Sequence, residues 1–184
     1  MKIDLFDIEG PVLFTPSTFS DDRGSFTETF RAREFEARIG TNETFVQDNE
    51  SFSKLQGTVR GLHFQRPPHA QGKLVRCTAG SIVDVAVDAR SQSDTYGQHI
   101  RVILSAENTR QLWVPPGFLH GFSTIEANTI VAYKCTNYYS QESDGNVRFD
   151  DPELGIDWGL ESGSAILSDK DLKAPSFKSF KSPF

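Results

Sequence analysis

Six basic side chains gather in residues 57–80, in a chain that is acidic as a whole. The stretch reads GTVRGLHFQRPPHAQGKLVRCTAG and contains Arg60, His63, Arg66, His69, Lys73 and Arg76. The complete chain has 19 lysines and arginines against 25 aspartates and glutamates, a net charge of -6. Local positive charge in a negative protein favours an anionic ligand, although a solvent-exposed pair of basic strands would give the same composition.

Alternation within this stretch indicates how the basic groups are displayed. In Lys73-Leu74-Val75-Arg76-Cys77 the odd positions share one face of a strand, so Lys73 lies beside Val75 and Cys77. A cation beside small apolar side chains is typical of the wall of a pocket. The elements around it must therefore be strands that enclose an interior.

The segments before this stretch predict short strands and one helix. Asp21-Asp22-Arg23-Gly24 is a strong turn signal, and in Ser25–Phe30 a period of two places Phe26, Glu28 and Phe30 on one face. That spacing puts Glu28 either at a sheet edge or in a binding site. The spacing of apolar residues in 31–39 predicts a short helix that Gly40 ends. The polar run at 47–49 is expected to face a ligand.

Beyond Gly80 the pattern is almost entirely β. The sequence predicts strands over 81–88, 100–104 and 129–135, with turns between them. Sequential short strands without intervening helices favour a sandwich or jelly roll over a parallel α/β sheet. We expect residues 1–184 to form a single domain, with an irregular segment from about residue 150 wrapped on the barrel and containing at most a short helix.

Composition excludes several classes of protein. Cys77 and Cys135 lie in apolar alternating runs, which predicts reduced, structural cysteines rather than a disulfide framework or a zinc site. The start of the chain lacks the apolar run of a signal peptide, and no stretch has the length of a membrane span, so a cytoplasmic protein without membrane contact is expected. The acidic net charge argues against binding to nucleic acid.

Two short segments resemble the motifs of the cupin barrels. Pro115-Pro116-Gly117-Phe118-Leu119-His120 matches the P-x-G-x-x-H turn, in which the histidine points into the barrel. A metal cupin usually supplies H-x-H earlier, where this chain has His63-Phe64-Gln65. A weak metal site from His63, His120 and a carboxylate such as Glu28 stays open as an alternative. His69 and His99 lie in polar or turn-rich sequence and are expected at the surface.

Motifs along nearly the whole chain resemble the dTDP-4-dehydrorhamnose 3,5-epimerases. They are D-x-R-G-x-F at 21–26, F-V-Q-D-N at 45–49, R-G-L-H-F-Q at 60–65, H-A-Q-G-K-L-V-R at 69–76, L-W-V-P-P-G-F-x-H-G-F at 112–122, Y-K-C-T-x-Y-Y at 133–139 and S-D-K-D at 168–171. The resemblance implies a cofactor-free and metal-free cupin homodimer with a double-stranded β-helix. Its substrate would be a dTDP-linked 4-keto-6-deoxyhexose that is inverted at C3 and C5.

That reaction explains the residue types. The 4-ketone acidifies the protons on both neighbouring carbons, so inversion needs a base, a donor for the enolate oxygen and an acid on the opposite face. The resemblance implies His63 as the base, Asp171 as the carboxylate that fixes its tautomer, and Tyr133 as the acid. Lys73 is a candidate donor to the enolate oxygen. Asp169 is the competing choice for the carboxylate.

The remaining matching positions are expected to bind the nucleotide sugar. Guanidinium groups bind phosphate oxygens in pairs, which suits the diphosphate. The predicted substrate-binding residues are Arg23, Phe26, Glu28, Gln47, Asn49, Arg60, His120, Tyr138, Asp144 and Lys170. The resemblance implies that the segment around 23–28 comes from a neighbouring subunit.

Two positions depart from the family pattern. Asp144 stands where the family commonly has glutamate, and Ser140-Gln141 replaces a more usual pairing with proline. The shorter carboxylate leaves the exact sugar open. The alternatives are an epimerase of C3 or C5 alone, a metal-dependent cupin, and a sugar-nucleotide binding module without catalysis.

Overall fold

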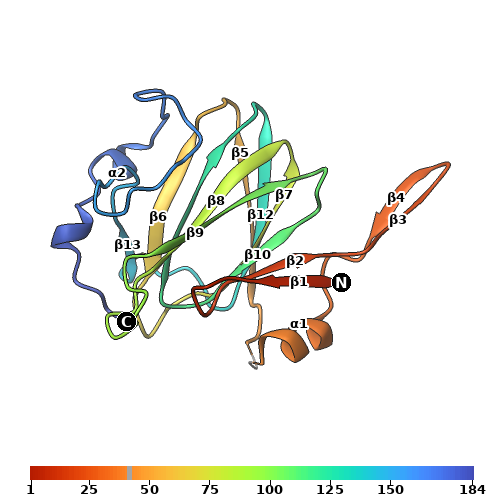
Figure 1. Cartoon of the computed structure of the whole chain (residues 1–184), viewed down its shortest axis with the longest axis horizontal. Coiled ribbons are helices and arrows are strands. Elements are labelled where there is room, and N and C mark those ends of the chain that lie inside the picture. The colour runs from red at the N-terminus through yellow and green to blue at the C-terminus, as the bar shows by residue number, and fades with distance from the viewer. Residues whose placement is uncertain (41–42) are drawn as a thin grey trace.

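The computed structural model describes residues 1–40 and 43–184, and its two main sheets are antiparallel and face each other (Figure 1). The larger sheet has six strands in the order β1-β2-β10-β7-β12-β5. These strands are β1 (Lys2–Leu5), β2 (Val12–Thr15), β10 (Gln111–Val114), β7 (Lys73–Ala79), β12 (Thr129–Cys135) and β5 (Gln47–Ser53).

The smaller sheet has five strands in the order β13-β6-β11-β8-β9. They are β13 (Asp144–Asn146), β6 (Val59–Gln65), β11 (Phe118–Thr124), β8 (Ser81–Asp88) and β9 (His99–Ser105). Neighbours in each sheet are mostly distant in sequence, so the chain crosses repeatedly between the sheets. This two-sheet arrangement confirms the prediction of an all-β fold with minor helix.

Apolar side chains from both sheets fill the space between them. Val75 and Cys77 of β7 meet Ile82 of β8 and Phe122 of β11 in one core cluster. Every residue of β8 is buried, unlike a strand with one solvent-exposed face. The alternation of β7 places Lys73 on this inner side with Val75 and Cys77, as its sequence indicates.

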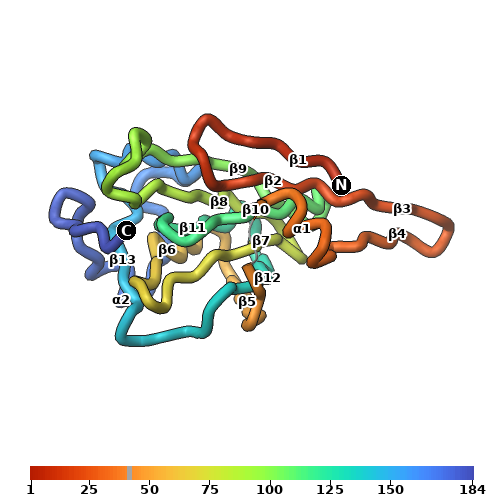
Figure 2. The backbone as a smooth tube through the Cα atoms, turned by 90° about the horizontal axis from the view of Figure 1, so that it is seen from below, coloured from red at the N-terminus to blue at the C-terminus, as the bar shows by residue number. Residues whose placement is uncertain are grey.

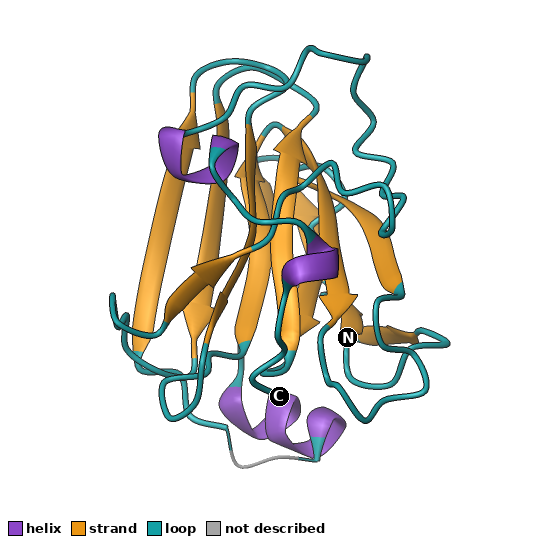
Figure 3. Cartoon of the chain, turned by 90° about the vertical axis from the view of Figure 1, so that its left-hand side faces the viewer, coloured by secondary structure: helices purple, strands orange, loops and turns teal. Residues whose placement is uncertain are grey.

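The C-terminal segment covers the outer face of the smaller sheet and explains why β8 is buried on both sides. Leu154 and Trp158 pack with Val83 and Val85 of β8 in a second cluster. The indole of Trp158 also donates to the carbonyl of Phe149 at 2.8 Å. The segment includes two short turns of helix, α2 (Asp169–Leu172) and the 3₁₀ helix η1 (Phe177–Ser179), which lie across the strands in Figure 3.

A close approach between β6 and β11 brings two histidines together. A Cβ atom on Gly61 would lie 2.5 Å from the Cα of Gly121, so only glycines allow the strands to come this near. In the register of this pair, His63 of β6 lies opposite His120 of β11.

The exposed His69 agrees with its expected surface position, whereas His99 is partly buried.

The predicted helix is α1 (Ala32–Ile39), and Gly40 ends it in the left-handed conformation with φ of 72°. Phe35 is the buried residue of α1, and its ring packs edge-on against Trp113 with centroids 5.0 Å apart. The helix thereby attaches to the outer side of the larger sheet. None of the described helices is long and apolar enough to cross a membrane.

A two-stranded hairpin projects from the body of the molecule. It consists of β3 (Thr18–Asp21) and β4 (Gly24–Thr27), and Figures 1 and 2 show it extending away from both sheets. Phe19 and Phe26 pair across it and are 66% and 69% exposed. Two largely exposed phenylalanines on a projecting hairpin leave an apolar surface that the chain does not cover itself.

Candidate active site

Two adjoining cavities between the sheets share three polar side chains. One has a volume of about 380 Å³ and the other about 400 Å³. His63, Lys73 and Tyr133 line both. Predicted catalytic residues from β6, β7 and β12 therefore meet at one place.

His63 forms a hydrogen-bonded dyad with Asp171, which belongs to α2. The His63 Nε2 atom lies 2.6 Å from Asp171 Oδ1. Asp171 is only 5% exposed, whereas the imidazole is partly open to the cavity. The structure thus brings Asp171 to the histidine, and the alternative carboxylate, Asp169, forms no hydrogen bond or ion pair with it.

The charge of Asp171 fixes the tautomer of His63. Burial alone would raise the pKa of Asp171, but hydrogen bonds from His63 and Ser168 outweigh it and hold that pKa below its usual value. An ionised carboxylate only accepts hydrogen bonds, so Nε2 of His63 must donate. The Nδ1 atom keeps its lone pair and is available as a base.

Lys73 and Tyr133 approach from the opposite sheet. Burial is the main cause that lowers the pKa of Lys73, and the nearby Asp84 and Asp144 carboxyls oppose it. Burial likewise raises the pKa of Tyr133 above its ordinary value of 10.0. The phenol is therefore protonated at neutral pH and able to donate a proton or a hydrogen bond.

A second histidine–carboxylate pair includes His120, which lines the 380 Å³ cavity. His120 Nε2 is 2.7 Å from Asp84 Oδ1, and both residues are buried. The other oxygen of Asp84 has no hydrogen-bond partner among the described residues. This leaves a buried, incompletely paired carboxylate on β8, next to His120.

Polar groups from β5 and β6 continue the site outward. Gln47 and Asn49 line the 400 Å³ cavity and bond to each other at 3.0 Å, whereas Asp48 points to the other face and pairs with Lys134. Because alternate strand residues face opposite sides, Asp48 does not line this cavity with Gln47 and Asn49 but lines a third cavity, of about 370 Å³. Arg60 lines the neighbouring cavity and donates to Ser53 and to the carbonyl of Phe52.

The outer rim of the site contains Asp144, Lys170 and Tyr139. The Lys170 ammonium contacts the Asp144 carboxylate, and the Tyr139 hydroxyl lies 3.5 Å from the same oxygen. All three line the 400 Å³ cavity. Tyr138, which the sequence favours, is 64% exposed and does not line this cavity.

The hairpin residues lie apart from these cavities within the chain. Arg23 forms an ion pair with Asp21 at 2.6 Å, and Glu28 forms one with Arg31 at 2.7 Å. Phe26 and Glu28 line a separate hollow beside α1. One chain alone therefore does not assemble the complete set of predicted binding residues.

The alternative metal site is not formed by these residues. Glu28 is held on the hairpin side, away from the two histidines, and each histidine has its own aspartate partner. Across residues 1–40 and 43–184, no group of three or more histidine, cysteine, aspartate or glutamate side chains could hold a metal ion. The Gln65 amide donates to the carbonyls of His69 and Tyr138, so it fixes a loop.

Comparison with known proteins identifies the family. Residues 6–179 match the family model described as dTDP-4-dehydrorhamnose 3,5-epimerase. The chain belongs to this epimerase family. A dTDP-4-dehydrorhamnose 3,5-epimerase of Salmonella typhimurium is 51% identical over 164 residues, covering 89% of this chain and 88% of that protein.

Solved structures of epimerases have the same cupin jelly roll. A dTDP-6-deoxy-D-glucose-3,5-epimerase from Legionella pneumophila, in complex with dTDP-4-keto-L-rhamnose, is 44% identical with a TM-score of 0.93. That match covers 98% of this chain and 94% of the other. A 3'-monoepimerase from Streptomyces bikiniensis, in complex with dTDP-quinovose, is 31% identical with a TM-score of 0.86, covering 93% and 85%.

Three side chains of this epimerase-family site were missed by sequence reasoning. They are Ser168, Asp84 and Tyr139. Ser168 was visible as the first residue of S-D-K-D, a typical N-cap pattern, but the cap gives no sign of a contact with a catalytic carboxylate. Asp84 is an acid within an otherwise apolar strand, which is a usable signal. No sequence signal separates Tyr139 from Tyr138, because the loop geometry decides which ring faces the cavity.

Proposed function

We propose that the protein inverts C3 and C5 of dTDP-4-dehydro-6-deoxy-D-glucose and so forms dTDP-4-dehydro-L-rhamnose. The observation that supports this best is the placement of His63 and Tyr133. They project from opposite sheets into the same two cavities. A sugar ring between the sheets would have a base on one face and an acid on the other, which inversion requires.

In the proposed reaction, Nδ1 of His63 removes the proton from a carbon next to the 4-ketone. The electron pair of that C–H bond moves into the ring and leaves the ketone oxygen as an enolate. Tyr133 then gives its hydroxyl proton to the opposite face of the carbon, and the ketone is restored. Solvent exchange returns a proton to Tyr133 and removes one from His63 before the second carbon reacts.

Asp171 and Lys73 assist this step electrostatically. The Asp171 carboxylate stabilises the imidazolium that forms when His63 takes the proton. Lys73 shares both cavities with His63 and Tyr133, so its amino group can donate to the enolate oxygen. No cofactor is needed, because the ketone of the substrate itself holds the electron pair.

The nucleotide part would lie along the outer side chains. We propose Arg60 for the diphosphate and neutral hydrogen bonds from Gln47 and Asn49. His120 would bond the sugar. The rim residues proposed to hold the rest of the ligand are Lys170, Asp144, Tyr138 and Tyr139. Tyr139 lines the 400 Å³ cavity, and we propose that its ring stacks on the base.

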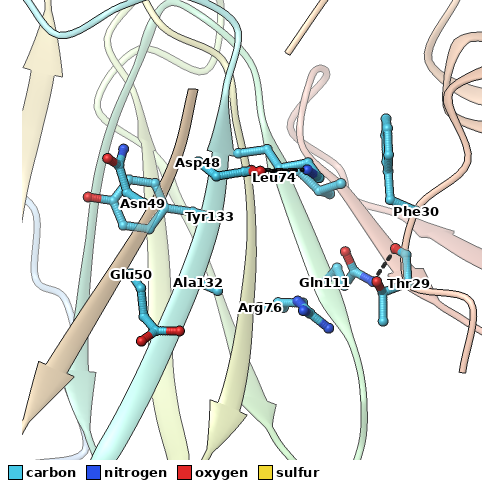
Figure 4. A pocket seen from close by; sticks show the side chains of 11 residues that line it. Thr29, Phe30, Asp48, Asn49, Glu50, Leu74, Arg76, Gln111, Ala132 and Tyr133 are labelled. Atoms are coloured by element: carbon cyan, nitrogen blue, oxygen red, sulfur yellow. Dashed lines mark hydrogen bonds and ion pairs between the residues drawn. The ribbon is translucent and has the colours of Figure 1, made fainter. Parts of the chain in front are cut away.

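We propose that a homodimer completes the site, with Arg23, Phe26 and Glu28 supplied by the hairpin of a second copy. The exposed phenylalanines of the hairpin need a partner surface. The outer face of the larger sheet offers one, with a cavity of about 370 Å³ whose side chains Figure 4 shows. Arg76 and Glu50 line it, and neither has an ion-pair partner within the described residues.

The dimer is tested by sedimentation equilibrium of the wild-type protein and of Phe26→Glu. We expect a dimer for the wild type, and a monomer with impaired dTDP binding for the variant. The substitution would place a charge where the proposed dimer buries the Phe26 ring. A wild-type monomer with full activity would contradict this arrangement.

We further propose one domain over residues 1–184 and a cytoplasmic location.

The nearest competing function is epimerisation of one carbon only, which the likeness to the Streptomyces bikiniensis 3'-monoepimerase favours. Incubation of dTDP-4-dehydro-6-deoxy-D-glucose with the protein in deuterated water, followed by proton NMR, separates the two. The double epimerase exchanges and inverts at both C3 and C5. Exchange confined to one carbon would reject the double inversion, and no exchange would favour a binding module.

A further inference from the structure

Asp171 is held by a second side chain besides His63. Ser168 Oγ donates to Asp171 Oδ2 at 2.9 Å, while Asp171 Oδ1 accepts from His63. The same Ser168 Oγ accepts the backbone N–H of Asp171 at 3.2 Å. Because a hydroxyl has a single hydrogen and one lone pair is already occupied by this N–H, that hydrogen is directed to the carboxylate.

The hydrogen bonds use both oxygens of Asp171 in a buried environment. Its side chain is 4% exposed, so water cannot replace a lost donor without cost. Ser168 also lines the 380 Å³ cavity together with His63 and Asp171. The three side chains therefore form a short chain of hydrogen bonds that ends at the histidine facing the cavity.

The helix that presents Asp171 is too short to be rigid alone. α2 has four residues. Besides the bond between Asp171 and His63, it is attached to the sheet by Asn146 of β13, whose side-chain amide donates to the carbonyl of Lys170 at 3.0 Å. The rotamer of Asp171 is fixed at one oxygen by His63 and at the other by Ser168. Without Ser168, only the contact with the reacting imidazole would orient the carboxylate.

We propose that Ser168 is a positioning residue of the epimerase, holding Asp171 against His63 and setting the proton affinity of the pair. This inference rests on the proposed role of His63 as the base. The hydroxyl stabilises the pair most when Asp171 is charged and His63 is neutral, since that state has a net negative charge. Removing the hydroxyl should therefore favour the protonated pair.

Other charged groups near the dyad set the background for this effect. On α2 they are Asp169 and Lys170, and the groups that line the cavities with His63 are Arg60, Lys73, His120, Tyr133 and Asp144. All remain in place when Ser168 is changed. A shift seen on that change alone can thus be assigned to the lost hydroxyl.

The test compares Ser168→Ala, Ser168→Thr and Asn146→Ala. Ser168→Ala should lower kcat about 10-fold with little change in KM, because Asp171 loses the bond that orients it and His63 is then held less well in the reactive geometry. Its acidic limb in the pH profile of kcat/KM should move to higher pH. Ser168→Thr keeps the hydroxyl and should retain most of the activity and the wild-type limb.

Asn146→Ala is the structural control. It weakens the attachment of α2 but leaves the hydrogen bond between Ser168 and Asp171, so it should lower the melting temperature without moving the acidic limb. The proposal is overturned if Ser168→Ala leaves the limb unmoved or matches Asn146→Ala in every measurement. If Ser168→Ala does not fold, Ser168→Cys takes its place, with a smaller upward shift expected from the weaker thiol donor.

An activity-independent readout separates this inference from the proposed reaction. NMR titration of the His63 imidazole should show proton uptake at higher pH in Ser168→Ala than in the wild type. If the wild type fails to exchange substrate deuterium, the proposed function is wrong whatever the titration shows. If the wild type is active and the titrations coincide, only the role of Ser168 is rejected.

Discussion

Tyr133→Phe should separate enolate formation from inversion. The change removes one hydroxyl and keeps the ring, which packs against the core between the sheets. Within residues 1–40 and 43–184 the Tyr133 hydroxyl forms no hydrogen bond with another residue. No partner is left unsatisfied, so the free energy of unfolding should change by less than about 1 kcal/mol.

The effect on inversion should be much larger than the effect on folding. A general acid typically contributes about 10²- to 10⁴-fold, which corresponds to about 2.7–5.4 kcal/mol of activation free energy at 25 °C. His63, Asp171 and Lys73 keep their positions, so the enolate still forms. With the acid missing, the imidazolium of His63 is the nearest donor and returns the proton to the original face.

The assay is proton NMR of the 4-keto sugar nucleotide in deuterated water. Tyr133→Phe should incorporate deuterium at C3 or C5 and yield little inverted product. Equal loss of exchange and inversion would show that Tyr133 is needed to form the enolate. Undiminished inversion would refute its role as the acid, and a thermal melt close to that of the wild type excludes misfolding as the cause.

Three further predictions concern carboxylates and the diphosphate. Asp171→Asn should lower kcat about 10- to 100-fold in steady-state assays, because a neutral amide stabilises the imidazolium less. The kcat of Asp169→Asn should stay within about twofold of the wild-type value. The reverse order would refute the assigned dyad. Arg60→Ala should weaken dTDP binding, measured by calorimetry, about 10- to 100-fold, which is the value of one charged hydrogen bond. Its kcat should be nearly unchanged. Normal dTDP affinity with lost turnover would instead assign Arg60 to the reacting centre. Burial alone would raise the pKa of Asp88, but hydrogen bonds from Arg90 and neighbouring hydroxyls hold that pKa far below the ordinary 3.8. The ionised carboxylate therefore stabilises the fold above about pH 4, and this stabilisation is lost as the pH falls further. Asp88→Asn should therefore melt lower than the wild type at pH 7 and more nearly alike at pH 3, and equal melting at both would contradict this account.

Local pattern was enough to predict several of the elements. The strand over 81–88 and the helix ended by Gly40 follow from periodicity and from a residue that adopts positive φ readily. The inward position of Lys73 follows from strict alternation in β7. These features depend on neighbouring residues in the chain, so the sequence carries them directly.

The resemblance of the motifs to the family named the residues of the site but not their distances. That Asp171, rather than Asp169, meets His63 depends on how α2 packs against β6, 108 positions away in sequence. That Tyr139 faces the cavity in place of Tyr138 depends on a loop without repeating pattern. Neither choice leaves a periodic signal.

By itself the sequence determined the fold class, the strand alternation and, through its resemblance to the family, the proposed catalytic side chains. The tertiary structure decided which groups meet: Asp84 with His120, and Ser168 with Asp171. It also decided that the hairpin with Phe26 lies away from the cavities of its own chain. The physical reason is that hydrogen-bond partners are chosen by the packing of segments distant in sequence, whereas alternation and turns arise from interactions between adjacent residues.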